Sequence, residues 1–340
     1  MKKLNFFNSF VYYVNVLCAL LLVLGSIKRH TTWDFISFLS FLSLMLPYLV
    51  AINFVFLIYW MLQRRRQLVL SLVVLVVGFL SHGTFIKVFN VNAEVAKEDI
   101  SVLSFNSHGS RGLFWTRSRK YGNEIAKFIK DQDSDIVSFQ EFDARSTSNY
   151  EQYPYKFVNY KFSEKRRIIQ AIFSKYPIIK KGTLDFPESN NNAIYADILI
   201  EQDTVRVYNL HLQSFRIRAG FLKTKSPKLL FGRVNHAFRK QQEQVYLINN
   251  HKESITHKII ISGDFNNTQF SSIYHTLKGD MTDSFLEHGS GLGTTYSFKF
   301  LPFRIDFLLF DEDLEVRSHK NYSVKLSDHK PVMASFRFRN

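Results

Sequence analysis

Three long apolar runs at the start of the chain constrain its fold more than any other feature. They cover residues 6–27, 35–62 and 68–88 of a chain of 340 residues. A helix needs about 20 mainly apolar residues to cross a bilayer, and each run reaches that length. We therefore expect residues 1–90 to form a transmembrane anchor with three helices. Three buried helices of a water-soluble core are disfavoured, because the runs follow one another directly.

Basic residues around these runs set the expected orientation, since Lys and Arg accumulate on the cytoplasmic side of membrane proteins. With the N-terminus inside, five basic residues are cytoplasmic and four lie outside. The first group is Lys2, Lys3, Arg64, Arg65 and Arg66, and the second is Lys28, Arg29, Lys87 and Lys97. An odd number of helices then places the rest of the chain on the extracytoplasmic side, after a polar linker over residues 91–98.

The remainder, residues 99–340, has the composition of a globular domain with a basic surface. It holds 35 basic and 26 acidic residues, a surplus of nine within the net charge of +15. Such a surface attracts polyanions, either nucleic acid or anionic lipid headgroups, without choosing between them. The only cysteine, Cys18, lies in an apolar run, so the chain has neither a disulfide framework nor a zinc site built from several cysteines.

Short β-rich runs outnumber helical runs in the domain, and the two do not alternate strictly. This pattern predicts an α+β fold with a mixed or antiparallel core. The expected strands cover residues 100–105, 135–139, 155–160, 168–174, 195–200, 205–212, 259–261, 304–310, 315–318 and 331–338, and the expected helices cover 118–131 and 233–250.

The stretch KIIISGDFNNT, residues 258–268, is the most informative part of the domain. Three isoleucines form a short apolar strand, and a turn at Gly263 then presents Asp264 and Asn266. Residues two apart on an extended backbone point the same way, so this carboxylate and amide can face one site. A carboxylate suits a hard cation or an attacking water, and an amide can donate to a phosphate oxygen.

Further polar residues stand at or just after the ends of other apolar strands. Catalytic groups concentrate on loops that a rigid sheet positions, so this set predicts one functional site. Its members are Asn106, Glu141, His211, Asp264, Asn266, Asp306, Asp328 and His329.

This set resembles the endonuclease/exonuclease/phosphatase superfamily, the deoxyribonuclease I-like metal-dependent phosphoesterases. The resemblance covers essentially all of residues 99–340 and follows the family's order. The matching pieces are LSFNSHG at 103–109, DIVSFQE at 135–141, AIFSKYPI at 171–178, YNLHLQS at 208–214, SGDFNN at 262–267, RIDFLLF at 304–310 and SDHKPV at 327–332. It implies a four-layered α/β sandwich, with two β-sheets face to face and helices outside, and hydrolysis of phosphate esters.

A phosphodiester resists attack because nucleophile and phosphate are both electron-rich, so a catalyst must neutralise charge and orient water. Glu141 is the expected ligand of a divalent metal, and Asn106 is expected to help hold the metal or the phosphate. Asp264 is expected to orient and deprotonate the attacking water, and Asn266 to donate to the phosphate. Hard oxygen ligands favour Mg²⁺, with Mn²⁺ as a substitute.

His329 and Asp306 form the expected carboxylate–histidine pair, which fixes the tautomer and favours the charged imidazole. The resemblance gives His329 one of two roles, general base or donor to a phosphate oxygen, and the sequence does not decide between them. By the same resemblance, His211 matches a second histidine that binds phosphate. Asp328 is expected to complete the metal shell.

One basic segment stands apart from this set. Residues 214–240 contain eight Lys or Arg and no acidic residue, with Phe215, Phe221 and Phe231 interleaved. Such a segment suits a grip on a polyanion or on anionic lipid, and equally a solvated basic loop and helix face.

The predicted function is a membrane-anchored, Mg²⁺-dependent phosphoesterase that acts on phosphodiester bonds, with a nuclease as the first choice of substrate class. A phospholipid or sphingolipid phosphodiesterase, or a phosphatase, is the alternative that a membrane tether favours. A non-catalytic membrane scaffold with the same fold is the alternative of another class. The full set of acids, amides and histidines disfavours it.

Overall fold

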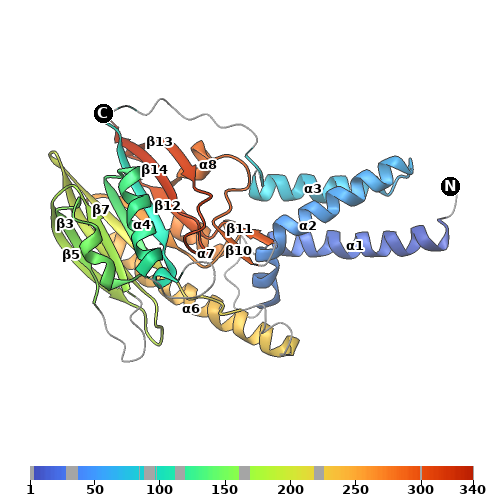
Figure 1. The fold of residues 1–340 in the computed structure, drawn as a ribbon. Coiled ribbons are helices and arrows are strands. Elements are labelled where there is room, and N and C mark those ends of the chain that lie inside the picture. Colours follow the sequence, from blue (N-terminus) through green and yellow to red (C-terminus); the bar gives the residue numbers. More distant parts are fainter. Residues whose placement is uncertain are drawn as a thin grey trace.

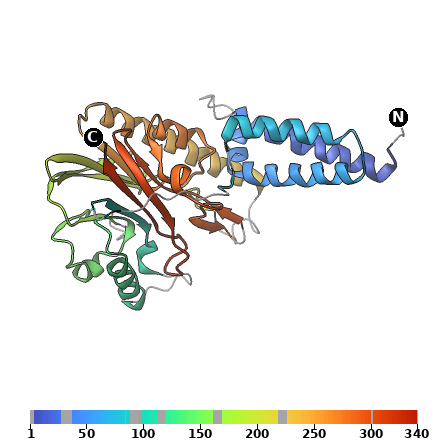
Figure 2. The ribbon, with the colours of Figure 1, turned by 90° about the horizontal axis from the view of Figure 1, so that it is seen from above.

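The computed structural model describes residues 4–27, 37–83, 85–87, 96, 98–111, 119–160, 169–217, 226–298 and 301–339. They form a bundle of helices followed by a domain with two β-sheets (Figures 1 and 2). Most of the expected linker over 91–98 falls outside the described residues.

The bundle contains α1 (Phe6–Ile27), α2 (Ser37–Leu62) and α3 (Leu68–His82). Among the described residues, two stretches are long and apolar enough to cross a membrane, Phe6–Ser26 and Leu42–Leu62. The expectation of three spanning helices is wrong for the third run, since α3 has only 15 residues. It ends before Gly83, where a φ of 71° leaves the helical region, and the described residues 85–87 that follow are not helical.

A polar contact in the interior joins all three helices of the bundle. Trp60 of α2 donates through Nε1 to Oδ1 of Asn15 in α1, over 3.0 Å, and the Nδ2 of Asn15 donates to Ser71 of α3, also over 3.0 Å. These three side chains are buried among apolar neighbours. Polar contacts between apolar helices fix how the helices align, so they specify the register of this bundle.

The domain consists of two six-stranded sheets. The first has the strand order β13-β14-β1-β2-β4-β3 and the second has the order β5-β6-β7-β8-β12-β9. The bounds are β1 (Ile100–Asn106), β2 (Ile136–Phe142), β3 (Tyr155–Val158), β4 (Ile169–Ser174), β5 (Ile178–Asp185), β6 (Asn192–Ile200), β7 (Asp203–His211), β8 (Lys258–Asp264), β9 (Thr282–Asp283), β12 (Asp306–Phe310), β13 (Leu314–Asn321) and β14 (Val332–Phe338).

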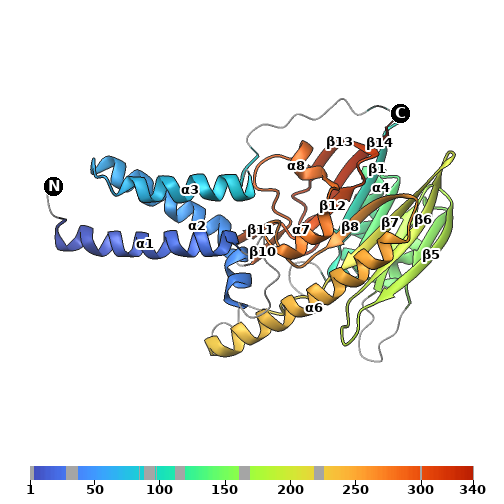
Figure 3. The same ribbon diagram turned by 180° about the vertical axis from the view of Figure 1, so that it is seen from behind.

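The two sheets pack against each other through their inner faces, and helices cover their outer faces. One apolar cluster fills the space between the sheets, with Val102, Ile172, Val207 and Leu308 among its members. The outer face of the first sheet packs on α4 (Arg119–Gln132). The second sheet packs on α6 (Pro227–Glu253) and on the short α7 (Ser272–Lys278), as Figure 3 shows from behind. The expected α+β sandwich is therefore confirmed.

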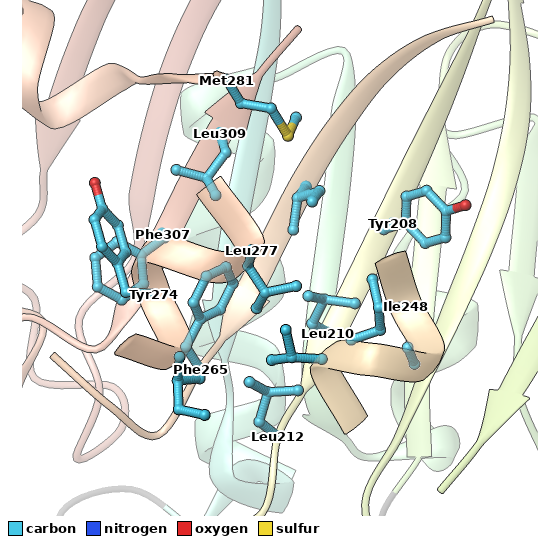
Figure 4. Packing of buried hydrophobic residues seen from close by; sticks show 14 of the residues in the cluster. Tyr208, Leu210, Leu212, Ile248, Phe265, Tyr274, Leu277, Met281, Phe307 and Leu309 are labelled. Atoms are coloured by element: carbon cyan, nitrogen blue, oxygen red, sulfur yellow. The ribbon is translucent and has the colours of Figure 1, made fainter. Parts of the chain in front are cut away.

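The packing of the second sheet on its helices is dense and apolar. Figure 4 shows this cluster. Tyr208 and Leu210 of β7, with Leu212 just after it, pack with Ile248 of α6 and Leu277 of α7. All five side chains are almost completely buried. A rigid layer of this kind gives the loops at the ends of β7 and β8 a fixed support.

The strand register brings the polar strand ends to one edge of the sandwich. β1 and β2 are parallel, and Asn106 pairs with Gln140. In the other sheet, β7 and β8 are parallel, and His211 pairs with Asp264. β12 runs antiparallel to β8 and begins with Asp306 opposite Asp264. Asn106 of the first sheet donates to Asp264 of the second at 2.9 Å, so the polar strand ends of both sheets meet at this edge.

Several elements differ from the expected pattern. β5 was not expected. It is an edge strand in which no residue is buried and which includes two lysines, so its sequence lacks an apolar strand pattern. α6 begins at Pro227, six residues before the expected start at residue 233. The hairpin of β10 (Tyr296–Phe298) and β11 (Leu301–Phe303) and the short α8 (Ser284–His288) were also not expected.

The bundle packs directly on the domain. Tyr48 of α2 donates to the carbonyl of Pro302 in β11 over 2.7 Å, and Leu44 belongs to the apolar cluster of the second sheet and α6. Phe270, in the loop after β8, is 4 % exposed and packs among residues of all three bundle helices. It also stacks on Phe85, with ring centroids 4.8 Å apart. The bundle and the domain thus share part of their cores.

Candidate active site

Asp264 is the centre of the site at the end of β8. Its carboxylate is 1 % exposed and accepts a hydrogen bond from Asn106 Nδ2 at 2.9 Å. The backbone N–H of Asn266 donates to the other carboxylate oxygen at 2.8 Å. Burial raises the pKa of Asp264 to about 6, partly opposed by His329. A carboxylate with this pKa is suited to exchange a proton near neutral pH.

His329 and Asp306 form the expected pair beside Asp264. Nδ1 of His329 lies 3.0 Å from Oδ2 of Asp306, and its other ring nitrogen, Nε2, lies 3.7 Å from Oδ2 of Asp264. Burial would lower the pKa of His329, but the carboxylates of Asp306 and Asp264 hold it well above its usual range. The pair therefore presents a charged imidazole with one ring nitrogen toward the site.

Tyr296 supports this imidazole from the β10–β11 hairpin. Its ring lies 4.9 Å from the ring of His329, and the two residues are joined by an isolated backbone bridge. Burial raises the pKa of Tyr296 to about 12, so its hydroxyl stays protonated. The sequence patterns gave no signal for this contact, because the hairpin was not expected.

Glu141 reaches the site through an irregularity in β2. The register between β2 and β4 shifts between Phe139 and Phe142, and Glu141 has a positive φ of 47°. A bulge of this kind re-aims one side chain at a sheet edge, commonly at a functional site. The carboxylate lies 3.9 Å from Nε2 of His211, which in turn lies 3.8 Å from Asp264. Neither distance is a hydrogen bond, so space separates these groups.

His108 and Asp328 form a further pair at the rim. Nδ1 of His108 lies 3.2 Å from Oδ1 of Asp328, and Ser327 donates to the same oxygen over 3.2 Å. Burial would raise the pKa of Asp328, but the bond from His108 and the charge of His329 lower it to about 2. The carboxylate expected in the metal shell is therefore engaged with His108, a residue outside the predicted set.

Asn266 is placed at the site, but its side chain has a structural partner. Its Nδ2 donates to the backbone carbonyl of Leu212 at 3.0 Å, and its φ of 50° is positive. This bond ties the loop after β8 to the end of β7. The expected donation to a phosphate stays a prediction, which requires the second amide hydrogen or a rotation of the side chain.

Polar contacts also hold the rest of the loop after β8 in place. Asn267 donates to Gln241 of α6 at 2.8 Å, and Gln269 accepts from the buried guanidinium of Arg304. Arg304 also pairs with the buried carboxylate of Asp283, through two bonds of 3.0 and 2.8 Å. The loop that follows the central aspartate is thereby fixed at both ends.

The donor set fits a hard divalent cation. Asn106 and Glu141 offer oxygen ligands beside Asp264, and among the described residues no side chain donates a hydrogen bond to the Glu141 carboxylate. Asp264, Asp306 and His329 also lie within metal-binding distance of one another. Asp306 is already hydrogen-bonded to Nδ1 of His329. The oxygens of Glu141 and Asn106 therefore match the preference of Mg²⁺ for oxygen ligands better.

All eight predicted residues lie at the same edge of the sandwich. The carboxylate of Asp264, the Asp306–His329 pair, the oxygens of Asn106 and Glu141 and the second imidazole, that of His211, lie close together. Such a set can neutralise an anionic ester, orient a water against it and protonate a leaving oxygen.

Both parts of the chain match known family models. Residues 89–329 match the model of the "Endonuclease/Exonuclease/phosphatase family", and residues 8–85 match that of "Domain of unknown function (DUF8431)". No curated protein sequence matches the chain significantly.

Solved structures share the fold of the domain. The human Nocturnin catalytic domain with bound sulfate is 16 % identical, with a TM-score of 0.55 over 74 % of this chain and 97 % of that one. A mannosyl-6-phosphatase of Bacteroides thetaiotaomicron is 18 % identical, with a TM-score of 0.53 over 70 % and 100 %. Truncated Caenorhabditis elegans TDP2 is 18 % identical, with a TM-score of 0.54 over 71 % and 98 %.

Proposed function

The chain belongs to the endonuclease/exonuclease/phosphatase family, and from that premise we propose that it hydrolyses phosphate esters at a membrane with the help of Mg²⁺. One observation carries the proposal above all. The Asp306–His329 pair directs a charged imidazole toward the buried carboxylate of Asp264, which Asn106 also contacts. A purely structural cluster has little use for so many buried ionisable groups at one sheet edge.

Each residue of the site has a separate role in this proposal. Asp264, with its raised pKa, orients the attacking water and accepts its proton. His329, held by Asp306, donates to the phosphate, where charge grows in the transition state. His211 and Asn266 contact further phosphate oxygens. These contacts offset the negative charge of the phosphate, which otherwise repels the attacking water.

Glu141 and Asn106 would hold the divalent cation, and Asp328 would support its shell through the contact with His108. When bound, Mg²⁺ neutralises charge on the ester and stabilises the leaving oxygen. Mn²⁺ offers the same oxygen coordination and would substitute for it.

The bundle would anchor the enzyme in the membrane. Its two candidate spans have the length and composition for crossing, and α3 would pack beside them. Two crossings place the domain on the same side as the N-terminus. The extracytoplasmic placement that three crossings predict requires α3 to cross as well. Accessibility of a cysteine on the domain to an impermeant reagent in intact cells distinguishes these two topologies.

Two substrate classes suit this site. Nucleic acid is favoured by the basic surplus of nine in residues 99–340. A membrane lipid phosphoester is favoured by the contact of the bundle with the catalytic loop, where Thr268 donates to the carbonyl of Ser43 at 3.4 Å. This contact keeps the site close to the point at which the chain enters the membrane.

The test uses the full chain in lipid nanodiscs with Mg²⁺, and again with EDTA. Supercoiled plasmid, vesicles of phosphatidylcholine and phosphatidylglycerol, and a soluble aryl phosphate are offered in parallel. Metal-dependent turnover of any of them, lost in Asp264→Ala, supports a phosphoesterase and names its substrate class. Turnover that persists in Asp264→Ala and His329→Ala rejects the site. Absence of all turnover in a folded, metal-loaded chain favours a non-catalytic scaffold.

A further inference from the structure

Asn209 is a buried amide that lies between the two sheets, two residues before His211 in β7. Its neighbours Tyr208 and Leu210 belong to the cluster that packs on the helices (Figure 4). Side chains alternate along a strand, so Asn209 faces the first sheet. A fully buried amide is costly unless its polar atoms have partners, and here those partners indicate what the residue holds in place.

The polar groups of Asn209 are bonded to two strands of the first sheet. Nδ2 donates to the backbone carbonyl of Phe139 in β2 at 2.8 Å and to that of Ala171 in β4 at 3.1 Å. Oδ1 accepts from Nε2 of Gln140 at 2.7 Å. The backbone carbonyl of Asn209 accepts from Nε2 of Gln170 at 3.0 Å. Both amide hydrogens and both carbonyl oxygens of this residue therefore contact the opposite sheet.

These partners lie around the bulge that carries Glu141. Phe139 and Ala171 are the last partners of β2 and β4 before the register shifts, and pairing resumes at Phe142. Glu141 stands in that interval with a φ of 47°. Because a left-handed backbone is unfavourable for a glutamate, the surrounding structure must hold it there. Asn209 fixes the backbone at the point where this irregularity begins.

A second polar link between the sheets shows that alignment of the sheets does not depend on Asn209 alone. Ser262 of β8 donates to the hydroxyl of Ser138 in β2 at 2.8 Å, and both side chains are buried. Ser138 pairs with Ile172 in the regular part of the ladder. Sheet alignment is served at this position, whereas the contacts of Asn209 are gathered at the bulge.

We propose that Asn209 is a positioning residue for the proposed cation site of Glu141 and Asn106. Through the carbonyls of Phe139 and Ala171 and the side chain of Gln140, it fixes the bulge that brings the Glu141 carboxylate to the catalytic edge. The inference rests on the proposed role of Glu141 as a cation ligand. It goes beyond that role because it makes the position of a ligand on the first sheet depend on a residue of the second.

The test measures binding of Mn²⁺ to the full chain in nanodiscs of phosphatidylcholine. Mn²⁺ accepts the same oxygen ligands as Mg²⁺, and electron paramagnetic resonance reads its free concentration directly. Asn209→Ala removes the side-chain bonds to the bulge. Ser138→Ala removes the other link between the sheets and is the matched control. Each variant is made alone and together with Glu141→Gln.

We expect Asn209→Ala to weaken Mn²⁺ binding by about tenfold or more, the usual effect of losing a group that orients a ligand. Ser138→Ala should lower the melting temperature and leave Mn²⁺ binding unchanged. When Glu141→Gln is already present, Asn209→Ala should weaken the remaining binding no further, because a residue that acts through Glu141 then has no ligand to position. Such non-additivity is what two coupled residues show, and a general loss of stability does not produce it.

Unchanged binding in Asn209→Ala, beside weakened binding in Glu141→Gln, would overturn the inference and leave the cation site intact. Equal weakening by Asn209→Ala with and without Glu141→Gln would also overturn it, since the effect would not pass through Glu141. Unchanged binding in Glu141→Gln would reject the cation site and the inference together. If Asn209→Ala does not fold, Gln140→Leu removes the bond to Oδ1 from the other side. It should weaken binding only while Glu141 is present, and unchanged binding in this variant would overturn the inference.

Discussion

At the residue scale, the proposed chemistry depends on a carboxylate that holds a histidine. Asp306 contacts Nδ1 of His329 at 3.0 Å, so Asp306→Asn should preserve the shape of the side chain and remove the charge that keeps the imidazole protonated. We expect kcat to fall by about 10²- to 10⁴-fold, the usual contribution of a positioned acid or base. Asp313→Asn, in the exposed turn after the same strand, is the matched control. Equal kcat values in the two variants would exclude a role for the pair.

Glu141 makes a separate prediction about the metal. Its carboxylate lies at the rim of the site, 3.9 Å from Nε2 of His211 and without a hydrogen bond to it, so Glu141→Gln should leave the fold intact. We expect the Mg²⁺ concentration for half-maximal activity to rise by more than about tenfold, since even residues that only orient a ligand contribute that much. Titration of activity with Mg²⁺, beside the exposed control Glu151→Gln, measures the shift. An unchanged requirement would place the cation elsewhere, for example between Asp264 and Asp306.

His319 predicts how stability depends on pH, away from the catalytic edge. It lies buried between Ser284 and Asn321, and burial lowers its pKa from 6.5 to about 4. Between these values the unfolded chain binds a proton that the folded chain does not, so stability falls as the pH falls from about 6.5 to 4. The loss amounts to about 3 kcal/mol. Thermal unfolding of His319→Gln should lose this part of the pH dependence, whereas the exposed control His257→Gln should keep it.

At the scale of elements, the loop after β8 joins the catalytic edge to the bundle. Phe270 is buried among bundle residues, six positions after Asp264. Phe270→Ala should destabilise the protein by about 3 kcal/mol through the cavity it leaves. We also expect kcat to fall by about tenfold, because small displacements of catalytic groups are costly. Phe336→Ala, buried between the sheets, should lower the melting temperature similarly and leave kcat unchanged at a temperature at which both variants are folded.

Much of this architecture could be predicted from the sequence, because strand patterns and polar strand ends are local signals. Asp264 and Glu141 each follow an apolar run, and the two parallel pairs bring such ends together. What the sequence did not reveal depends on partners far along the chain. The tilted ring contact between Tyr296 and His329 and the bond from Asn266 to the backbone of Leu212 follow no periodic pattern in the sequence.

For the third apolar run the local signal was misleading: it predicted a longer helix than the structure contains. The composition of residues 68–88 suits a membrane helix, yet α3 ends at His82 because Gly83 leaves the helical region. Phe85 then turns back to stack on Phe270 of the domain. An apolar residue beyond the helix thus serves contact with the domain and does not lengthen a membrane span.

At the scale of the whole molecule, the bundle and the domain form one structural unit, and the bundle is more than a tether. Leu44 belongs to the core cluster of the second sheet. Across the boundary, the hydroxyl of Tyr48 donates to Pro302 and the carbonyl of Ser43 accepts from Thr268. Residues 98–340 alone would expose the surfaces that Phe270 and the β10–β11 hairpin bury against the helices. We expect this fragment to melt at least several degrees below the full chain in the same detergent. We also expect it to have lower activity.

Cutting the chain between the bundle and the domain distinguishes the effect of their non-covalent contacts from the effect of the covalent connection. A protease site introduced within residues 91–95 allows the full chain to be cleaved after it has folded. If the contacts matter, the cleaved protein should keep its activity while the two parts stay together. It should lose activity when the bundle is removed by size-exclusion chromatography in a stronger detergent. Activity that falls at the moment of cleavage would mean that the covalent connection itself is required. Activity that survives removal of the bundle would mean that the domain holds the loop after β8 on its own, through Asn267, Gln269 and Arg304.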